Sequence, residues 1–302
     1  MIYDIFHDEC KEDGYWHCFI FIPRDTQDKL NSLLQKPRNN LNYKHPIHFR
    51  DIRRKAKTHY VKVRLVRSWI SILLYSIQQQ KIEAELYFGH KNHIPNYVKI
   101  KGDNEKIGAR LVIFREKESH KDMYEDMSIT KKIETTFRMG LKGGTHFLFF
   151  DENVKIGNVY IDYEKEGFEK NFNSNNILDR FKRESRGNLF FESDSEIIPV
   201  DKKEYKLKDR TSEFMQLADV TVGGFRTQKL KMKNFEARFQ ATKPLKILLE
   251  KEVEIKPRMK NSRYYKAFTF SDAWIENEEW MFENIHIEKE DNTQETLFGE
   301  LL

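Results

Sequence analysis

The first 23 residues constrain the fold most, because they hold two strand-like segments separated by a tight turn. Residues 2–8 and 16–22 are rich in β-branched and aromatic side chains, and Pro23 closes the second segment. The stretch KEDG between them has the composition of a turn. The sequence therefore predicts a β-hairpin whose first strand ends in the polar sequence HDEC, residues 7–10.

Composition bounds the class of protein. The chain has 302 residues with 33% charged residues, yet 23 Phe, 13 Tyr and 4 Trp supply material for a sizeable core. It contains no apolar run of about 18 residues and no signal-peptide pattern at its start, so we expect a cytoplasmic protein without a membrane span. Its two cysteines, Cys10 and Cys18, are too few for a disulfide framework.

Apolar residues at helical spacing predict two well-defined helices. One is expected over residues 59–80 and the other over residues 212–226. A shorter helix is expected to begin at Asp25 or Thr26 and to run through Leu34, with a polar loop over residues 36–46.

The middle of the chain predicts a helix followed by a strand. Ser128 is expected to cap a helix that ends at Gly140 and Gly143. The run THFLFFDE that follows is bulky and apolar, so it predicts a fully buried strand ending at Asp151.

We expect two parts in the chain. Residues 1–226 form the core, with an insertion at 89–126 around the apolar stretch ARLVIF. From residue 227 onward, Lys-rich and Glu-rich pieces alternate with aromatic residues, which predicts a C-terminal appendage, 227–302, packed on the core.

Three aspartates stand where a metal site is expected. Asp8 and Asp151 end predicted strands, and Asp219 lies in an otherwise apolar helix. Ligands of open α/β sheets bind at the carboxyl ends of the strands, and a buried unpaired carboxylate is costly. Mg²⁺ or Mn²⁺ would bind such oxygen ligands, and two such ions could hydrolyse a phosphodiester. Each aspartate could instead be a turn residue, a loop cap or half of a buried ion pair.

Two further patterns have competing interpretations. A cluster of basic residues is either a phosphate-binding patch or the solvated face of a helix, and its candidate contacts are Arg50, Arg53, Arg54 and Lys57. His7, Cys10, His17 and Cys18 could together bind a metal, although their spacing matches no usual zinc pattern.

The stretches HDEC, IHFRD, FLFFD and QLAD occur in this order over residues 1–226. This order resembles a prokaryotic family, the domain-of-unknown-function family 3800, whose members are taken to have an RNase H-like fold. The resemblance implies an α/β fold with a mixed sheet, in which the first three strands are antiparallel and later ones parallel, flanked by helices. It also implies a metal-dependent nuclease site.

Carried onto this chain, the resemblance makes Asp8, Asp151 and Asp219 metal ligands and Glu9 a fourth carboxylate. It assigns substrate-binding or supporting roles to a second set of residues, Gln216, His48, Asp51 and Asp209. The chain departs from the family pattern at Cys10-Lys11, where the family has Ser-Gly, and in a longer segment before QLAD.

The tail suggests a protein partner. Gln294, Leu297 and Phe298 resemble the Q-x-x-L-F pattern that docks on the bacterial sliding clamp, and an amphipathic end packed on its own core is the alternative. The sequence thus predicts a metal-dependent nuclease acting on RNA or DNA. A non-catalytic nucleic-acid or protein-binding module with the same fold and an enzyme acting on small nucleotides are the alternatives.

Overall fold

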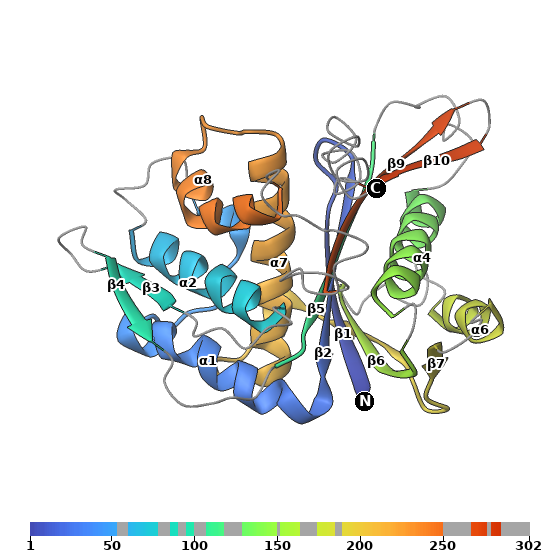
Figure 1. Cartoon of the computed structure of the whole chain (residues 1–302), viewed down its shortest axis with the longest axis horizontal. Coiled ribbons are helices and arrows are strands. Elements are labelled where there is room, and N and C mark those ends of the chain that lie inside the picture. The colour runs from blue at the N-terminus through green and yellow to red at the C-terminus, as the bar shows by residue number, and fades with distance from the viewer. Residues whose placement is uncertain are drawn as a thin grey trace, which may run out of the picture.

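The computed structural model is an α/β structure built around one mixed β-sheet (Figure 1). It describes residues 1–52, 60–77, 85–89, 95–99, 107–117, 129–149, 152–163, 174–184, 189–249, 267–276 and 279–284.

The sheet is assembled from segments spread over the whole chain. Its strands are β1 (Ile2–Cys10), β2 (Tyr15–Pro23), β5 (Arg110–Glu116), β6 (Val154–Asp162), β7 (Leu189–Phe191), β8 (Ile197–Val200), β9 (Phe268–Glu276) and β10 (Glu279–Asn284). They lie in the order β10-β9-β5-β2-β1-β6-β7, and β8 also pairs with β6. A separate pair is formed by β3 (Glu85–Gly89) and β4 (Pro95–Lys99).

Strand direction changes in the middle of the sheet. β1 pairs antiparallel with β2, and β2 pairs antiparallel with β5. β6 then runs parallel to β1, and both β7 and β8 run parallel to β6. The predicted mixed sheet of antiparallel and parallel strands flanked by helices is therefore confirmed.

Helices cover both faces of this sheet. On one face, called the α7 face here, lie α1 (Gln27–Asn40), α2 (Tyr60–Ile77), α7 (Arg210–Lys229) and α8 (Glu236–Thr242), and on the other, the α4 face, lie α4 (Ile129–Leu148) and α6 (Ser174–Glu184) (Figure 1). Short 3₁₀ turns occur at Arg24–Thr26, Phe49–Asp51, Lys202–Glu204 and Lys243–Leu248. Among the described helices, none has both the length and the hydropathy that crossing a membrane requires.

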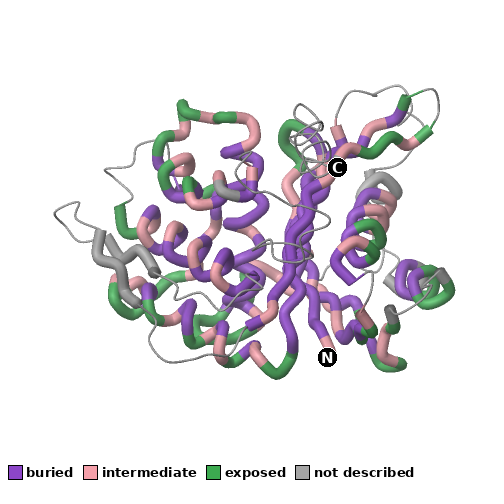
Figure 2. Tube along the Cα trace, in the orientation of Figure 1, coloured by how far each residue is buried: buried purple, intermediate pink, exposed green. Residues whose placement is uncertain are grey.

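Alternation along the strands produces two hydrophobic cores. Successive side chains of a strand point to opposite faces, so Phe6 packs on the α7 face and Ile5 on the α4 face. Buried residues follow the sheet and the inner sides of the helices (Figure 2). α7 is buried on nearly all sides because it lies between the sheet and the other helices of its face.

The N-terminal hairpin and the two long helices agree with the sequence predictions. β1 and β2 are joined by a turn in which Asp13 and Gly14 have positive φ values of 56° and 105°. α2 and α7 occupy the segments with helical spacing. α1 continues to Asn40, so the loop predicted from residue 36 begins later.

The prediction of a strand that ends at Asp151 is wrong. α4 continues through Gly140 and Gly143 to Leu148, and residues 145–148 are its last turn. The glycines allow close packing rather than ending the helix: a Cβ on Gly140 would lie 2.9 Å from Phe114 Cβ, and one on Gly144 would collide with Val112. Asp151 itself lies outside the described residues.

Two other segments differ from their expected places. The apolar stretch expected inside an insertion at 89–126 is strand β5, which lies in the sheet between β2 and β9. In the expected appendage, β9 pairs parallel with β5 and so continues the sheet, while α8 packs on α2 and α7. Both strands are buried on both faces, which removes the alternating pattern by which an exposed strand is recognised.

Candidate active site

Three carboxylates converge at the carboxyl ends of two parallel strands. Asp8 lies near the end of β1, and Asp162 is the last residue of β6. His7 pairs with Ile161 in the parallel register. Asp8 follows His7 and Asp162 follows Ile161, so the two aspartates are neighbours on the α7 face. Asp219 of α7 lies near enough to both Asp8 and Lys202 to interact with them electrostatically.

A lysine side chain lies among these carboxylates. Lys202 comes from the 3₁₀ turn after β8, and its Nζ lies 3.5 Å from Asp8 Oδ2 and forms an ion pair with Asp162 Oδ2. The side chain of Asp8 is 1% exposed, whereas that of Lys202 is 30% exposed. The cluster is therefore closed on the sheet side and opens to solvent on the side of Lys202.

The environment separates the pKa values of two of the aspartates. Burial raises the pKa of Asp8 well above its usual value, and the neighbouring Asp162 and Asp219 carboxylates add to this rise while Lys202 opposes it. Burial also raises the pKa of Asp219, but interactions with His48, Lys202 and the Phe49 N–H outweigh it, so the pKa is lowered overall. Asp219 is consequently ionised at neutral pH.

The segment before α2 completes the site. The Phe49 backbone N–H donates to Asp219 Oδ2 at 3.1 Å, and His48 Nδ1 lies 3.5 Å from the same oxygen. The His48 ring stacks on Tyr205 with 5.8 Å between ring centroids. The Tyr205 hydroxyl is buried and has no hydrogen-bond partner among the described residues. Burial raises the pKa of Tyr205 far above its usual value, and the three nearby carboxylates raise it further. The hydroxyl therefore keeps its proton.

Gln216 holds this segment in place and does not reach solvent. Its Oε1 accepts hydrogen bonds from the Ile47 N–H at 2.7 Å and from Arg38 Nη2 at 3.2 Å. Arg38 also pairs with the buried Glu213 at 2.9 Å. Gln216 is fully buried, so the expected direct contact with a phosphate does not fit the structure, and its role is to position the residues around His48.

Asp8 and Asp219 interact electrostatically, and the third described carboxylate near them is Asp162. The sequence analysis missed it, together with Lys202 and Tyr205. A usable signal was present, because the apolar alternation of VKIGNVYID ends at Asp162. The bulky run at 145–150 looked more like a buried strand, although its first residues end a helix that packs on the sheet.

Glu9 lies on the opposite face from Asp8, since neighbouring residues of a strand point to opposite sides. It pairs with Lys11 at 3.0 Å rather than joining the aspartates. A possible metal-binding group is formed by His7, Glu9 and His17. Each of them offers one ligand atom, and these three atoms lie within 4.8 Å of one another. Burial lowers the pKa of His17 to about 3 and that of His7 well below its usual value, so both rings are neutral.

The cysteines do not join the two histidines. Cys18 pairs with Asp8 in the antiparallel register and therefore lies on the α7 face, as does the side chain of Cys10. Both thiols are free. A four-residue cluster of the histidines and cysteines is therefore excluded by the alternation of the strands.

No model of a known protein family matches the chain, and no curated protein or solved structure matches it either. Around Lys202 the site contains the carboxylates of Asp8, Asp162 and Asp219 and the buried Tyr205 hydroxyl.

The other predicted site residues have different positions. Asp209 caps α7 by accepting a hydrogen bond from the Ser212 N–H at 2.8 Å, which gives it a structural role. Asp51 ends the 3₁₀ turn at Phe49–Asp51, and Arg50 in the same turn is exposed. The remaining predicted contacts lie outside the described residues, namely Arg53, Arg54, Lys57, Gln294, Leu297 and Phe298.

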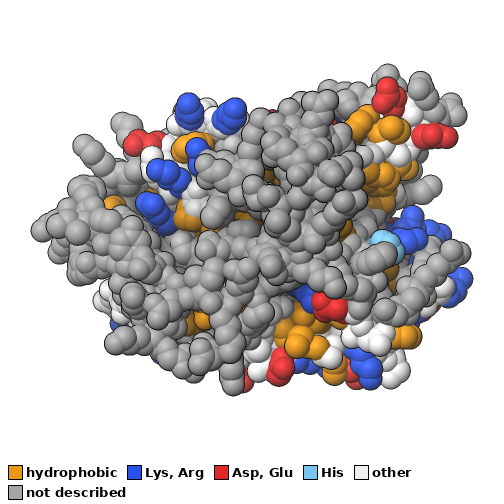
Figure 3. Space-filling view, viewed as in Figure 1, with side chains coloured by type: hydrophobic (Ala, Val, Ile, Leu, Met, Phe, Trp, Pro, Cys, Tyr) orange, Lys and Arg blue, Asp and Glu red, His pale blue; other side chains and the backbone are white. Residues whose placement is uncertain are grey.

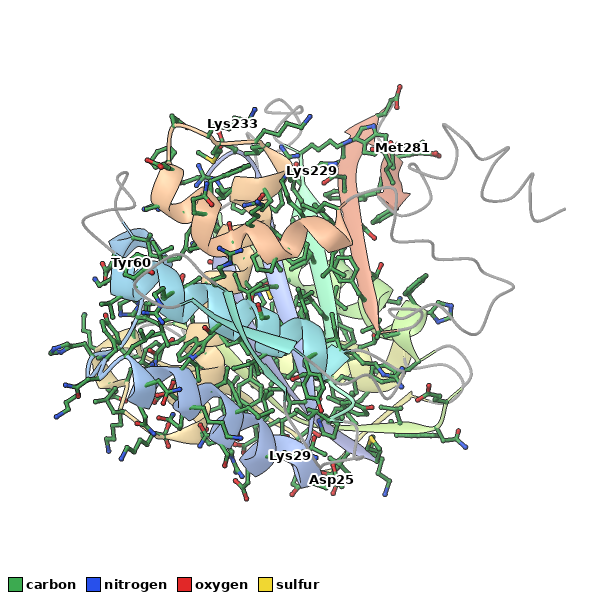
Figure 4. All side chains as sticks on the ribbon, turned by 60° about the vertical axis from the view of Figure 1, so that its left-hand side comes forward. Asp25, Lys29, Tyr60, Lys229, Lys233 and Met281 are labelled. Atoms are coloured by element: carbon green, nitrogen blue, oxygen red, sulfur yellow. The ribbon has the colours of Figure 1, made fainter. Side chains whose placement is uncertain are left out.

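A second basic segment borders the site. Residues 229–246 contain six Lys or Arg residues and one Glu. Arg238 of this segment donates to the backbone oxygens of Ile52 and Arg50, both at 2.9 Å, next to the segment that contacts Asp219. Lys and Arg side chains gather on this part of the surface, over α8 (Figure 3). Lys229 and Lys233 lie at the end of α7 and in the following turn (Figure 4).

Proposed function

We propose that the chain is a divalent-metal-dependent nuclease that hydrolyses phosphodiester bonds of RNA or DNA. In this proposal Asp8, Asp162 and Asp219 bind the metal. The observation that supports it most is the convergence of these three carboxylates around a single cationic group, Lys202. Segments more than two hundred residues apart meet there, at the carboxyl edge of the sheet where ligands of such folds bind.

The side chains fit Mg²⁺ or Mn²⁺. Both ions prefer oxygen ligands, and three carboxylates facing one ammonium leave an excess of negative charge for a divalent ion to balance. The unpartnered Tyr205 hydroxyl is a buried donor close to the carboxylates, where a phosphate oxygen would satisfy it.

Each residue has a chemical role in this proposal. The bound ions would supply an activated water and stabilise the leaving oxygen. Asp219 remains ionised and is held by the Phe49 N–H, so it keeps a fixed ligand geometry. Tyr205 keeps its proton and can donate it in a hydrogen bond to a phosphate oxygen. Lys202, on the open side of the cluster, would move outward and pair with the phosphate.

Two further observations favour a nucleic-acid substrate and the RNase H-like family. Arg238 of the basic residues 229–246 lies beside the site, and this segment could follow a phosphate backbone, which a small nucleotide would not need. The antiparallel pairing of β1, β2 and β5 and the parallel pairing of β6 with β1 agree with the mixed sheet that the resemblance to family 3800 implies.

A second candidate function follows from Lys202 itself. Its ammonium takes the place among the carboxylates that a cation would need. A non-catalytic nucleic-acid-binding module would keep this ion pair permanently. It would bind nucleic acid without metal and would not cleave it.

The test compares purified wild-type protein with Asp162→Asn and Asp219→Asn. Each is incubated with labelled RNA, DNA and hybrid duplex, with Mn²⁺, with Mg²⁺ and with chelator. We expect metal-dependent cleavage by the wild type and a loss of at least about 100-fold in both variants, because each removes a ligand charge. Asp151→Asn tests the carboxylate that the sequence predicted as a ligand, and a loss of cleavage in it would return Asp151 to the site.

Asp194→Asn is the matched control, because Asp194 is an exposed carboxylate in the turn between β7 and β8. It should cleave like the wild type. Equal cleavage by all the variants would exclude this site, and metal-independent binding without any cleavage would favour the binding module.

A further inference from the structure

A second group of potential metal ligands lies on the α4 face of the same hairpin. His7 and Glu9 are two residues apart in β1, so their side chains share this face. His17 pairs with Glu9 in the antiparallel register, which brings a third side chain onto the same patch. One ligand atom from each lies within 4.8 Å of the others. The aspartate cluster lies on the other side of the sheet, so the two groups are separate.

The two imidazoles are already placed almost as ligands of one ion. His7 Nε2 lies 2.9 Å from His17 Nδ1. Two nitrogens bound to one tetrahedral ion at about 2.0–2.1 Å would lie about 3.3 Å apart. A small separation of the rings would therefore admit an ion between them.

Thr136 of α4 orients the second ring. Its hydroxyl lies 2.8 Å from His17 Nε2. When Nε2 donates its proton to this hydroxyl, Nδ1 presents a lone pair toward His7. Metal-bound histidines commonly have such a partner on the other ring nitrogen, because it fixes the tautomer and the ring orientation.

The burial of these rings needs an explanation. His7 is 4% exposed and His17 is fully buried, packed against Phe19 and Phe137. In addition, His7 Nδ1 is buried and has no hydrogen-bond partner among the described residues. Placing imidazoles in an apolar core is costly when a ring nitrogen stays unpaired. A metal bound between His7 Nε2 and His17 Nδ1 would offset part of the cost of burying the two rings, while His7 Nδ1 would keep no partner among the described residues.

We propose that His7, His17 and Glu9 form a binding site for a divalent transition metal of the zinc class. Two neutral imidazoles and one carboxylate are ligands that Zn²⁺ and Co²⁺ prefer, whereas Mg²⁺ prefers sites made of oxygen atoms alone. The side chain of Glu9 is 16% exposed, so the ion reaches the site from the hairpin end. The bound ion joins β1 to β2, and the proposal is independent of the nuclease function.

The test uses the full chain after metal removal with a chelator. It is titrated with Co²⁺ in the presence of excess Mg²⁺, which occupies sites made of oxygen ligands. We expect one equivalent of Co²⁺ to bind with visible d–d absorption of a tetrahedral site, and Zn²⁺ to displace it. Glu9→Gln should weaken Co²⁺ binding at least about 10-fold, and His17→Gln should abolish the absorption.

Asp219→Asn is the control for the other site and should keep the Co²⁺ absorption. If His17→Gln does not fold, the Co²⁺ affinity of Glu9→Gln tests the proposal. This variant should fold, because Glu9 lies at the rim and the side chains of Glu and Gln have the same shape. Absence of Co²⁺ absorption in the wild type would overturn the proposal. Unchanged affinity in Glu9→Gln, or a sulfur-to-cobalt charge-transfer band from Cys10 or Cys18, would also overturn it.

Discussion

Lys202 Nζ lies 3.5 Å from Asp8 Oδ2, although the two residues are 194 positions apart in the chain. The ammonium also pairs with Asp162 and interacts with Asp219, so it stabilises the carboxylates when no other cation does. This single relationship suggests that the lysine and a divalent ion compete for the same oxygens.

Substitution Lys202→Met tests this competition. It removes one positive charge from the cluster, so we expect Mn²⁺ to bind at least about 10-fold more tightly than to the wild type. Isothermal titration with Mn²⁺ measures the affinity. Lys206→Met is the control, because Lys206 is an exposed lysine of the same loop. Equal affinities of both variants and the wild type would show that Lys202 does not compete with metal.

Gln216→Met tests the positioning of the segment around His48. The variant fills the same space but leaves the Ile47 N–H and one Arg38 donor without an acceptor. An unsatisfied buried donor costs about 1–3 kcal/mol, so the free energy of unfolding in urea should fall by about that amount. Mn²⁺ affinity should fall as well, because the Phe49 N–H is held less firmly at Asp219.

The control for this variant is Gln240→Met on α8, where the side chain is exposed. It should leave both quantities unchanged. A Gln216→Met protein as stable as the wild type would refute the structural role of this amide.

The glycines of α4 provide a matched pair. A Cβ on Gly144 would collide with Val112 of β5, whereas a Cβ on Gly143 would have no neighbour within 4 Å. Gly144→Ala should therefore destabilise the protein by about 1–3 kcal/mol. Gly143→Ala should stabilise it by about 0.5–1 kcal/mol, since alanine is the better helix former. Urea unfolding of both variants measures the difference, and similar values would contradict the packing of α4 on the sheet.

The buried histidines predict a loss of stability in acid when metal is absent. The folded-state pKa of His17 is about 3, below its ordinary value of 6.5, so between these values the unfolded chain binds a proton that the folded chain does not. His7 acts in the same direction. Stability should therefore fall as the pH decreases from 6.5, by about 1.4 kcal/mol per pH unit for each histidine.

Urea unfolding in chelator at several values between pH 7 and pH 4 measures this slope. His17→Gln should reduce the slope of stability against pH by about the contribution of one histidine. Glu9, Lys11 and Asp8 titrate or carry charge nearby and remain in both proteins, so the difference between the two slopes reports His17 together with its electrostatic effect on His7. An identical slope would mean that His17 is protonated in the folded state.

Predictions from the sequence succeeded where a segment itself shows a clear helical period or turn composition. The hairpin of β1 and β2 and the helices α2 and α7 follow from local periodicity and turn composition. They failed for β5 and β9, which are buried on both faces, and for the end of α4, whose bulky residues pack on the sheet. A short apolar run is compatible with a buried strand or a buried helix, and only its packing partners distinguish them.

The sequence by itself determined that β1 delivers Asp8 to the end of a strand and that α7 carries Asp219 among apolar residues. Only the tertiary structure decided that Asp162 is the described carboxylate beside them, that Lys202 lies between them, and that Glu9 faces the other way. The reason is physical. Local sequence determines the periodicity of an element, but the register of strands and the packing of helices determine which distant side chains meet.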